Sequence, residues 1–155
     1  MYIIKDLFTY TANQEKAHAE VFYRALKSCN SDNINIDGGY PVSYYDDVAK
    51  LLRAAEHGEF QEYDDVYPNF AKVAKEEGFI AISNIFNNIA EIEKKHGERF
   101  GKYADMIEKD TLYNREEETI TNCGYIYEGK SAPNTCPVCT YPKGYFIEFE
   151  ESPFE

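Results

Sequence analysis

The sequence has no tryptophan, and no stretch of it approaches the roughly 20 consecutive apolar residues that a membrane-spanning helix needs. Basic residues are also scarce. Sixteen lysines and arginines stand against 28 acids, which gives a formal net charge of −12 and a pI near 4.7. A surface of this charge repels a nucleic-acid backbone or an anionic membrane, so we expect neither as a partner and favour a cation instead.

The first ten residues, MYIIKDLFTY, lack the uninterrupted apolar segment of a secretory signal peptide, because Lys5 and Asp6 interrupt it. Only four cysteines are present, and three of them, Cys123, Cys136 and Cys139, fall within a 17-residue window. In the absence of an export signal, this clustering indicates a metal site rather than a disulfide framework. The sequence therefore predicts a cytoplasmic protein.

Two regions of different composition make up the 155 residues. Residues 1–112 carry helical periodicity and few turn formers, whereas residues 116–155 contain short β-type runs, at 125–127 and 145–149, among glycine, proline and cysteine. We predict a helical domain over 1–112 and a small β-containing domain over 116–155. The first should hold three helices, at about 2–27, 44–77 and 79–109, with a bend or break in the second at Pro68.

Each predicted helix has an apolar stripe that is interrupted midway by two ionisable residues. These pairs are Glu15 and His18, Glu59 and Glu62, and Glu93 and His96; the apolar members in the second helix are Val48, Leu51, Ala55, Val66, Phe70 and Val73. A spacing of three places both side chains of a pair on one helix face, about 5–6 Å apart. If the stripes face one another, four carboxylates and two imidazoles meet in one layer of a bundle. Burying such charges costs several kcal/mol each, and two divalent metals would compensate for that cost.

An internal repeat relates the first predicted helix to the third. Shifting the sequence by 78 residues aligns eight identical residues within 19 positions, including Glu15 with Glu93 and His18 with His96. Duplicated ligand helices predict a pseudo-symmetric site for two metals. The second helix precedes the third, so the same repeat requires a helix before the first. The sequence thus predicts a four-helix design whose first helix is absent from this chain.

A second candidate metal site lies in the segment NCGYIYEGKSAPNTCPVC. Cys136 and Cys139 form a Cys-x-x-Cys knuckle, and Cys123 matches the second half of another. Ile120 stands where the first half would have its cysteine. Three thiolates can still bind zinc together with water or an outside ligand. An iron centre with four thiolate ligands would need one more cysteine than this segment has. The remaining cysteine, Cys29, is expected at a helix end.

Together these motifs resemble the rubrerythrin family over nearly the whole chain. The segments NQEKAHAEVF, GEFQEYDDVYPNFAKVAKEEGF and EIEKKHGERF are similar to the second, third and fourth bundle helices of that family, and NCGYIYEGKSAPNTCPVCTYPKGYF is similar to its C-terminal domain. The resemblance implies a ferritin-like helical bundle followed by a small rubredoxin-like domain. It also implies a non-haem di-iron centre that reduces hydrogen peroxide to water in oxidative-stress defence. Electrons would be relayed from a reductase through the rubredoxin-like iron.

The resemblance also implies a role for each residue of the site. Glu15 and Glu93 would bridge the two irons, and His96 and Glu59 would hold one of them. His18 and Glu62 would be alternative ligands of the other iron, exchanged as the site changes oxidation state. Tyr67 matches a tyrosine that hydrogen-bonds near the site. The expected catalytic residues are Glu15, Glu62, Glu93 and Tyr67, and the expected metal ligands are Glu15, His18, Glu59, Glu62, Glu93, His96, Cys123, Cys136 and Cys139.

Two departures from the family pattern bear on function. The first bundle helix of the family is missing, and the three that are present leave an open apolar flank. We therefore expect the bundle to be completed in a homo-oligomer, most simply a dimer, or by a separately made helical fragment. With Ile120 in place of a cysteine, we expect iron or zinc at the incomplete cysteine site and impaired electron transfer through the C-terminal domain. Two alternatives stay open. One is a non-catalytic metal-binding or oligomerisation protein with structural zinc, and the other is iron storage as in ferritins.

Overall fold

The structure, a computed structural model, describes residues 2–29, 33, 35, 37–112, 118–121, 126–129, 131–138 and 140–148. Of residues 28, 29, 118–121, 126, 128, 147 and 148 it describes the backbone alone. The chain divides into two compact units, Ala12–Ala104 and Met1–Thr11 together with Asp105–Glu155. The domain boundary expected between residues 112 and 116 stays a prediction.

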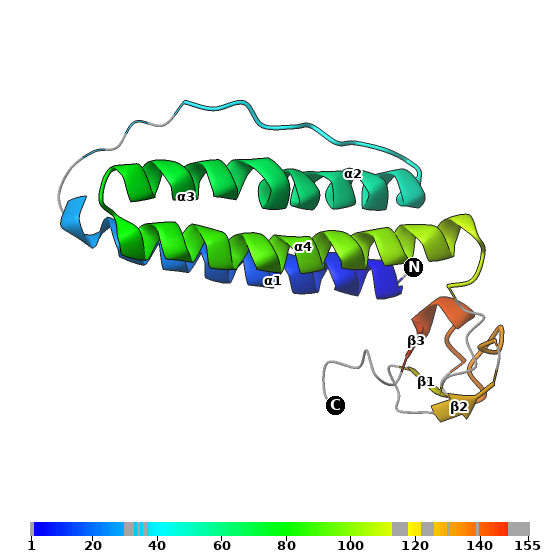
Figure 1. Cartoon of the computed structure of the whole chain (residues 1–155). Coiled ribbons are helices and arrows are strands. Elements are labelled where there is room, and N and C mark those ends of the chain that lie inside the picture. The colour runs from blue at the N-terminus through cyan, green and yellow to red at the C-terminus, as the bar shows by residue number, and fades with distance from the viewer. Residues whose placement is uncertain are drawn as a thin grey trace. The chain divides into compact units, whose positions relative to one another are not determined.

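Four α-helices, most of whose residues fall in the larger unit, come first along the chain (Figure 1). Helix α1 spans Tyr2–Ala25 and ends in the 3-10 turn η1, Leu26–Cys29; α2 spans Val48–Gln61, α3 spans Tyr67–Glu76 and α4 spans Ile80–Glu108. The described part of the connection between η1 and α2 returns along the length of the helices, so α1, α2 and α3 run in one direction and α4 in the opposite one. The mainly helical class predicted from the sequence is confirmed.

Helix α2 begins later than the apolar pattern predicted, at Val48 instead of residue 44. Asp47 has extended backbone angles, and its carboxylate accepts a hydrogen bond of 3.2 Å from the backbone N–H of Lys50. An aspartate in this position satisfies one of the N–H groups that the first turn of a helix leaves without a partner. The cap, and not the apolar periodicity, therefore sets the start of the helix.

The predicted break near Pro68 takes the form of a π-helical turn, η2, at Glu62–Val66 between α2 and α3. Proline has no N–H and cannot bond the carbonyl four residues earlier. The N–H of Tyr67 instead donates to the carbonyl of Glu62, five residues back, as in a π-helix. Pro68 itself lies in the first turn of α3, where the missing N–H costs little.

The π-helical turn shifts the buried face of α3 by one residue. Ala71 and Ala74 are buried, whereas Phe70 and Val73, which were predicted to continue the core stripe, are each 50% exposed. That part of the prediction was wrong, because it carried an uninterrupted 3.6-residue period across a turn that has a longer one. In α2 the fully buried leucine is Leu52, next to the predicted Leu51.

A tight reversal joins α3 to α4. Gly78 has a φ of +86°, and the N–H of Phe79 donates to the carbonyl of Ala74 over 2.7 Å. This is the hydrogen bond that closes a helix C-terminus when a glycine adopts the left-handed conformation. The centre of α4 is buried at Ile89, Glu93, His96, Phe100 and Tyr103, which follow one another in steps of four and three residues.

Three short strands in the smaller unit form an antiparallel sheet in the order β2-β1-β3. They are β1 at Glu118–Thr121, β2 at Ile126–Glu128 and β3 at Phe146–Glu148, with a 3-10 turn, η3, at Lys143–Tyr145. In the central strand, the Cα of Ile120 lies opposite Ile126 on one side and Ile147 on the other. The two predicted β-type runs correspond to β2 and β3, while β1 was not anticipated.

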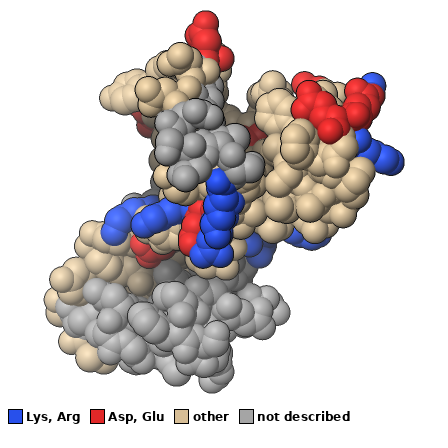
Figure 2. Space-filling view, turned by 90° about the vertical axis from the view of Figure 1, so that its left-hand side faces the viewer, with Lys and Arg blue, Asp and Glu red and all other residues tan. Residues whose placement is uncertain are grey.

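Charged side chains of both signs share the surface. On the face shown in Figure 2, the described lysines and arginines lie among acidic and uncharged residues. Several pair within one helical turn, such as Lys95 with Glu98 on α4, and exposed pairs of this kind contribute about 1 kcal/mol or less. None of the helices in the described ranges combines the length and the apolarity needed to cross a membrane.

Candidate metal centre

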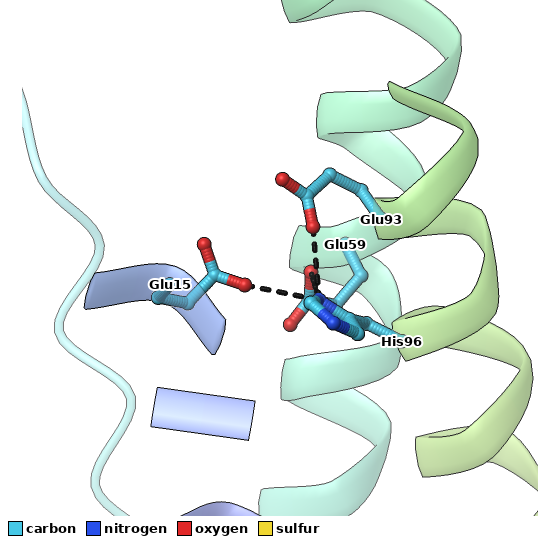
Figure 3. Close-up of side chains that lie close together, drawn as sticks. All are labelled: Glu15, Glu59, Glu93 and His96. Atoms are coloured by element: carbon cyan, nitrogen blue, oxygen red, sulfur yellow. Dashed lines mark ion pairs between the residues drawn. The ribbon is translucent and has the colours of Figure 1, made fainter. Parts of the chain in front are cut away.

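Helices α1, α2 and α4 bring four ionisable side chains together in the larger unit (Figure 3). Glu15 comes from α1, Glu59 from α2, and Glu93 and His96 from α4, and one ligand atom of each lies within 4.8 Å of the others. Glu93 is fully buried and His96 is 1% exposed. Carboxylates in such a position require compensation by a cation or by protons.

Atom Nδ1 of His96 faces three carboxylate oxygens at once. It lies 2.9 Å from Oε1 of Glu15, 2.9 Å from Oε2 of Glu93 and 3.4 Å from Oε2 of Glu59. A single ring nitrogen can donate only one hydrogen bond, and Nδ1 and both oxygens of Glu93 are buried without a hydrogen-bond partner of suitable geometry. Ligand atoms that converge on one point in this way could hold a common cation. Carboxylates with imidazole fit iron, zinc or manganese.

Glu15 and Glu93 each face both histidines of the predicted set. The second oxygen of Glu15, Oε2, lies 3.2 Å from Nδ1 of His18, and the second oxygen of Glu93, Oε1, lies 3.0 Å from the same nitrogen. The rings of His18 and His96 stack with their centroids 5.8 Å apart. Each carboxylate therefore presents one oxygen to each imidazole, which is a geometry in which two carboxylates can span two neighbouring metal positions.

The same charges determine the pKa values in the cluster. Burial alone would lower the pKa of His96, but Glu15, Glu59 and Glu93 around it raise that pKa to about 11. Burial would raise the pKa of Glu15, yet His96 and His18 outweigh burial and lower it. For Glu59, burial prevails and the pKa is raised despite His96. In the metal-free protein, therefore, a proton on His96 supplies the positive charge that a bound metal would supply.

Glu62 and Tyr67 form a second pair, at the two ends of the π-helical turn, and their side chains are hydrogen-bonded to each other. Burial raises the pKa of Glu62 to about 7, and the charges of the cluster carboxylates raise it in the same direction. Burial and the neighbouring Glu62 also raise the pKa of Tyr67. The ring of Tyr67 packs against Phe22 and Phe86, at centroid distances of 5.8 and 6.0 Å, which holds its hydroxyl toward Glu62.

One further residue contacts the centre and was missed in the sequence. The side-chain oxygen of Gln14 lies 3.1 Å from Nε2 of His96, on the side of the ring away from the carboxylates, and 3.3 Å from Nη1 of Arg99. The 78-residue repeat pairs Gln14 with Ile92 and Arg99 with Val21. These two positions, where polar residues replace apolar ones, are the signal that could have identified the contact.

Of the predicted cysteine ligands, Cys136 lies among the described residues, whereas Cys123 and Cys139 lie outside them. Cys136 is 1% exposed and packs with Ala132 and Phe146. Its carbonyl accepts a hydrogen bond of 3.0 Å from the N–H of Thr140. The cysteine site itself stays a prediction.

Comparison with known proteins gives two matches to family models. The family described as rubrerythrin matches residues 2–104, and the rubredoxin-like domain of rubrerythrin matches residues 121–147. The chain is 39% identical over 153 residues to a rubrerythrin of Clostridium perfringens, with coverage of 96% of this chain and 78% of the relative. It is 38% identical over 146 residues to a rubrerythrin of Nitratidesulfovibrio vulgaris, with coverage of 92% and 75%.

Solved structures give the same result. The chain superimposes on nigerythrin in a partially reduced state with a TM-score of 0.57 and 26% identity, covering 92% of this chain and 68% of the other. These matches confirm the predicted fold class, a ferritin-like helical part followed by a rubredoxin-like part.

Proposed function

Because the chain belongs to the rubrerythrin family, we propose that it is a non-haem di-iron peroxidase that reduces hydrogen peroxide to water in defence against oxidative stress. Rubrerythrins are generally oxidoreductases, and membership of the family implies iron binding. The observation that carries the proposal is the position of Glu15 and Glu93, each of which faces both His18 and His96.

In this proposal Glu15 and Glu93 would be ligands shared by the two irons, and His96 and Glu59 would hold one of them. His18 and Glu62 would be alternative ligands of the other. The 3.4 Å contact between Glu59 and His96 supports the assignment of these two to a single metal. When bound, ferrous ions supply the two electrons that reduce peroxide and the positive charge that stabilises the oxygen anion formed.

The chain's own residues hold the site in place around the reacting atoms. Burial of Glu93 and His96 keeps water away from the α4 side of the cluster. The hydroxyl of Tyr67 holds the carboxyl group of Glu62, and the aromatic packing of Tyr67 against Phe22 and Phe86 fixes that hydroxyl. In this proposal, Tyr67 contributes to the reaction by orienting the carboxyl group of Glu62.

The remaining elements of the proposal concern partners. Electrons would come from a reductase through iron held by Cys123, Cys136 and Cys139. The transfer would be less efficient because Ile120 supplies no thiolate. Zinc in this second site would have a structural role only.

The side chain of Glu15 is 39% exposed although it faces the cluster, so a second copy of the chain would shield the cluster from water. A cytoplasmic location belongs to the same proposal.

Reconstitution with ferrous iron under anaerobic conditions tests the proposal. We expect about two irons per helical site and consumption of hydrogen peroxide that oxidises about two electron equivalents per peroxide. Binding of zinc alone, without turnover, would instead support the structural alternative. Accumulation of iron far above the number of ligand positions would support storage.

A further inference from the structure

We propose that Gln14 is a positioning residue that fixes the tautomer and the orientation of His96, so that Nδ1 is the nitrogen presented to the metal. The inference rests on the proposed function only in needing a metal at the cluster, and it does not depend on peroxidase activity.

The atom of Gln14 that faces His96 is identified as an oxygen by a second contact. Nη1 of Arg99, which lies 3.3 Å from this atom, is always a hydrogen-bond donor. An amide nitrogen in the same place would oppose one donor with another. The oxygen of Gln14 therefore accepts from Arg99 and, over 3.1 Å, from Nε2 of His96, so Nε2 carries a hydrogen.

The hydrogen on Nε2 determines what Nδ1 can do. In a neutral imidazole with one nitrogen protonated, the other nitrogen carries the lone pair that binds a metal. Nδ1 is the nitrogen that lies 2.9 Å from an oxygen of both Glu15 and Glu93. Because His96 is 1% exposed, water cannot readily replace the bond to Gln14. Partners of this kind behind a ligand typically change metal affinity by about 10- to 100-fold.

The internal repeat shows that this support exists on one side of the site. The residues that correspond to Gln14 and Arg99 in the other half are Ile92 and Val21. Their side chains are apolar and 40% and 37% exposed, so they can neither accept nor donate a hydrogen bond beside His18. The two halves thus differ behind the ligands although the ligand pairs are identical. Ile92 also provides a control position that precedes a ligand glutamate, as Gln14 does.

The test uses zinc as a diamagnetic probe and three variants. Gln14→Met keeps the length of the side chain and removes the acceptor, Gln14→Glu keeps an acceptor, and Ile92→Met makes a matched apolar change at the corresponding position. In ¹⁵N-histidine NMR spectra, the native protein should show a slowly exchanging Nε2-bound proton on His96. Gln14→Met should lose this protection and bind zinc about 10- to 100-fold more weakly. Gln14→Glu should retain the protected proton and the zinc affinity of the native protein, and Ile92→Met should change neither.

Retention of the protected Nε2 proton and of native zinc affinity in Gln14→Met would overturn the proposal. Loss of the protected Nε2 proton in Gln14→Glu would also overturn it, because the loss in Gln14→Met would then come from altered packing and not from the missing acceptor. In the metal-free protein, in which His96 carries a proton on each ring nitrogen, the exchange rate of the Nε2 proton still reports the bond to Gln14. A native protein that binds no zinc would therefore contradict the proposed metal centre, while the proton would still decide the role of Gln14.

Discussion

The ring of Phe60 on α2 closes over Gly97 on α4, so that a β-carbon at Gly97 would lie 3.1 Å from ring atoms Cδ2 and Cε2. Gly97 is buried and directly follows His96. The missing side chain allows α2 and α4 to approach each other closely at the level of the metal cluster. Glu59, the neighbour of Phe60 on α2, reaches to 3.4 Å from Nδ1 of His96 at this same level.

Substitution Gly97→Ala should lower the free energy of unfolding of the metal-free protein by about 1–2 kcal/mol, although alanine is the better helix former, because the Phe60 ring must move. It should also weaken zinc binding, because Glu59 moves with α2. Urea denaturation and zinc titration measure the two effects. Gly58→Ala is the control: its β-carbon would meet nothing within 4 Å, so a gain of about 0.5–1 kcal/mol is expected. Equal losses in both variants would rule out the contact with Phe60 as the cause.

Divalent metal should stabilise the native protein through Glu93. At a free metal concentration of 100 times the dissociation constant, binding adds about 2.7 kcal/mol to the free energy of unfolding. Glu93→Gln removes a fully buried carboxylate from the cluster, so the metal-induced rise in melting temperature should largely disappear. Glu91→Gln, an exposed position on the same helix, should retain the rise. Calorimetry with and without zinc makes the comparison, and an unchanged rise in Glu93→Gln would place the metal elsewhere.

The raised pKa of Glu62 should make the metal-free protein less stable at higher pH. The folded-state pKa of about 7 lies above the ordinary value of 4.5, so the folded protein binds this proton more tightly than the unfolded chain does. The contribution of Glu62 to stability is therefore most favourable below pH 4.5 and falls as the pH rises to about 7. Glu62→Gln removes the titration and should be more stable than the native protein at pH 8 by about 1–2 kcal/mol. Denaturation at a series of pH values measures the difference.

Tyr67→Phe provides the matched variant for this experiment. The hydrogen bond from Tyr67 lowers the pKa of Glu62, so its loss should raise that pKa and move the pH-dependent fall in stability to higher pH. The ring contacts with Phe22 and Phe86 are retained in this variant. A fall that stays at the same pH in Tyr67→Phe and in Glu62→Gln would show that another group causes it.

Thr140 has a φ of +62°, which is unfavourable for a β-branched residue. The left-handed conformation costs about 1–2 kcal/mol for most residues, and asparagine tolerates it better than threonine does. Thr140→Asn should therefore stabilise the turn that follows Cys136 by about 0.5–1 kcal/mol, because the N–H of residue 140 can still donate to the carbonyl of Cys136. Slower hydrogen exchange of the Cys136 amide would report the gain. Thr135→Asn lies in the same segment without a positive φ, and an equal gain there would exclude strain as the cause.

Restoring a cysteine at position 120 should increase iron binding by the C-terminal part. The strand pairing of Ile120 with Ile126 and Ile147 is made through backbone atoms, so Ile120→Cys should leave β1 in place. We expect higher iron content and the visible absorption of a ferric thiolate centre, since four thiolates suit tetrahedral iron. Thr121→Cys adds a thiol one residue outside the Cys-x-x-Cys spacing and serves as the control. Identical spectra in the two variants would show that the local fold is not that of a rubredoxin.

The sequence by itself determined the helical class, the order of a helical part and a rubredoxin-like part, and the four ionisable residues that the structure brings together, Glu15, Glu59, Glu93 and His96. These features depend on short-range spacing: a period of 3.6 residues places side chains on one face, and a step of three places Glu93 and His96 together. The repeat at a spacing of 78 residues also showed that α1 and α4 carry equivalent ligand pairs. The sequence was also sufficient to recognise the family, because its motifs are local segments.

Only the tertiary structure decided how these residues meet. The π-helical turn moved the buried positions of α3 from Phe70 and Val73 to Ala71 and Ala74, because the turn changes the helical period at a proline. The bond between Gln14 and His96 joins residues 82 positions apart. A contact of that range depends on the packing of α1 against α4 and on the rotation of each helix about its axis, neither of which a local sequence period specifies.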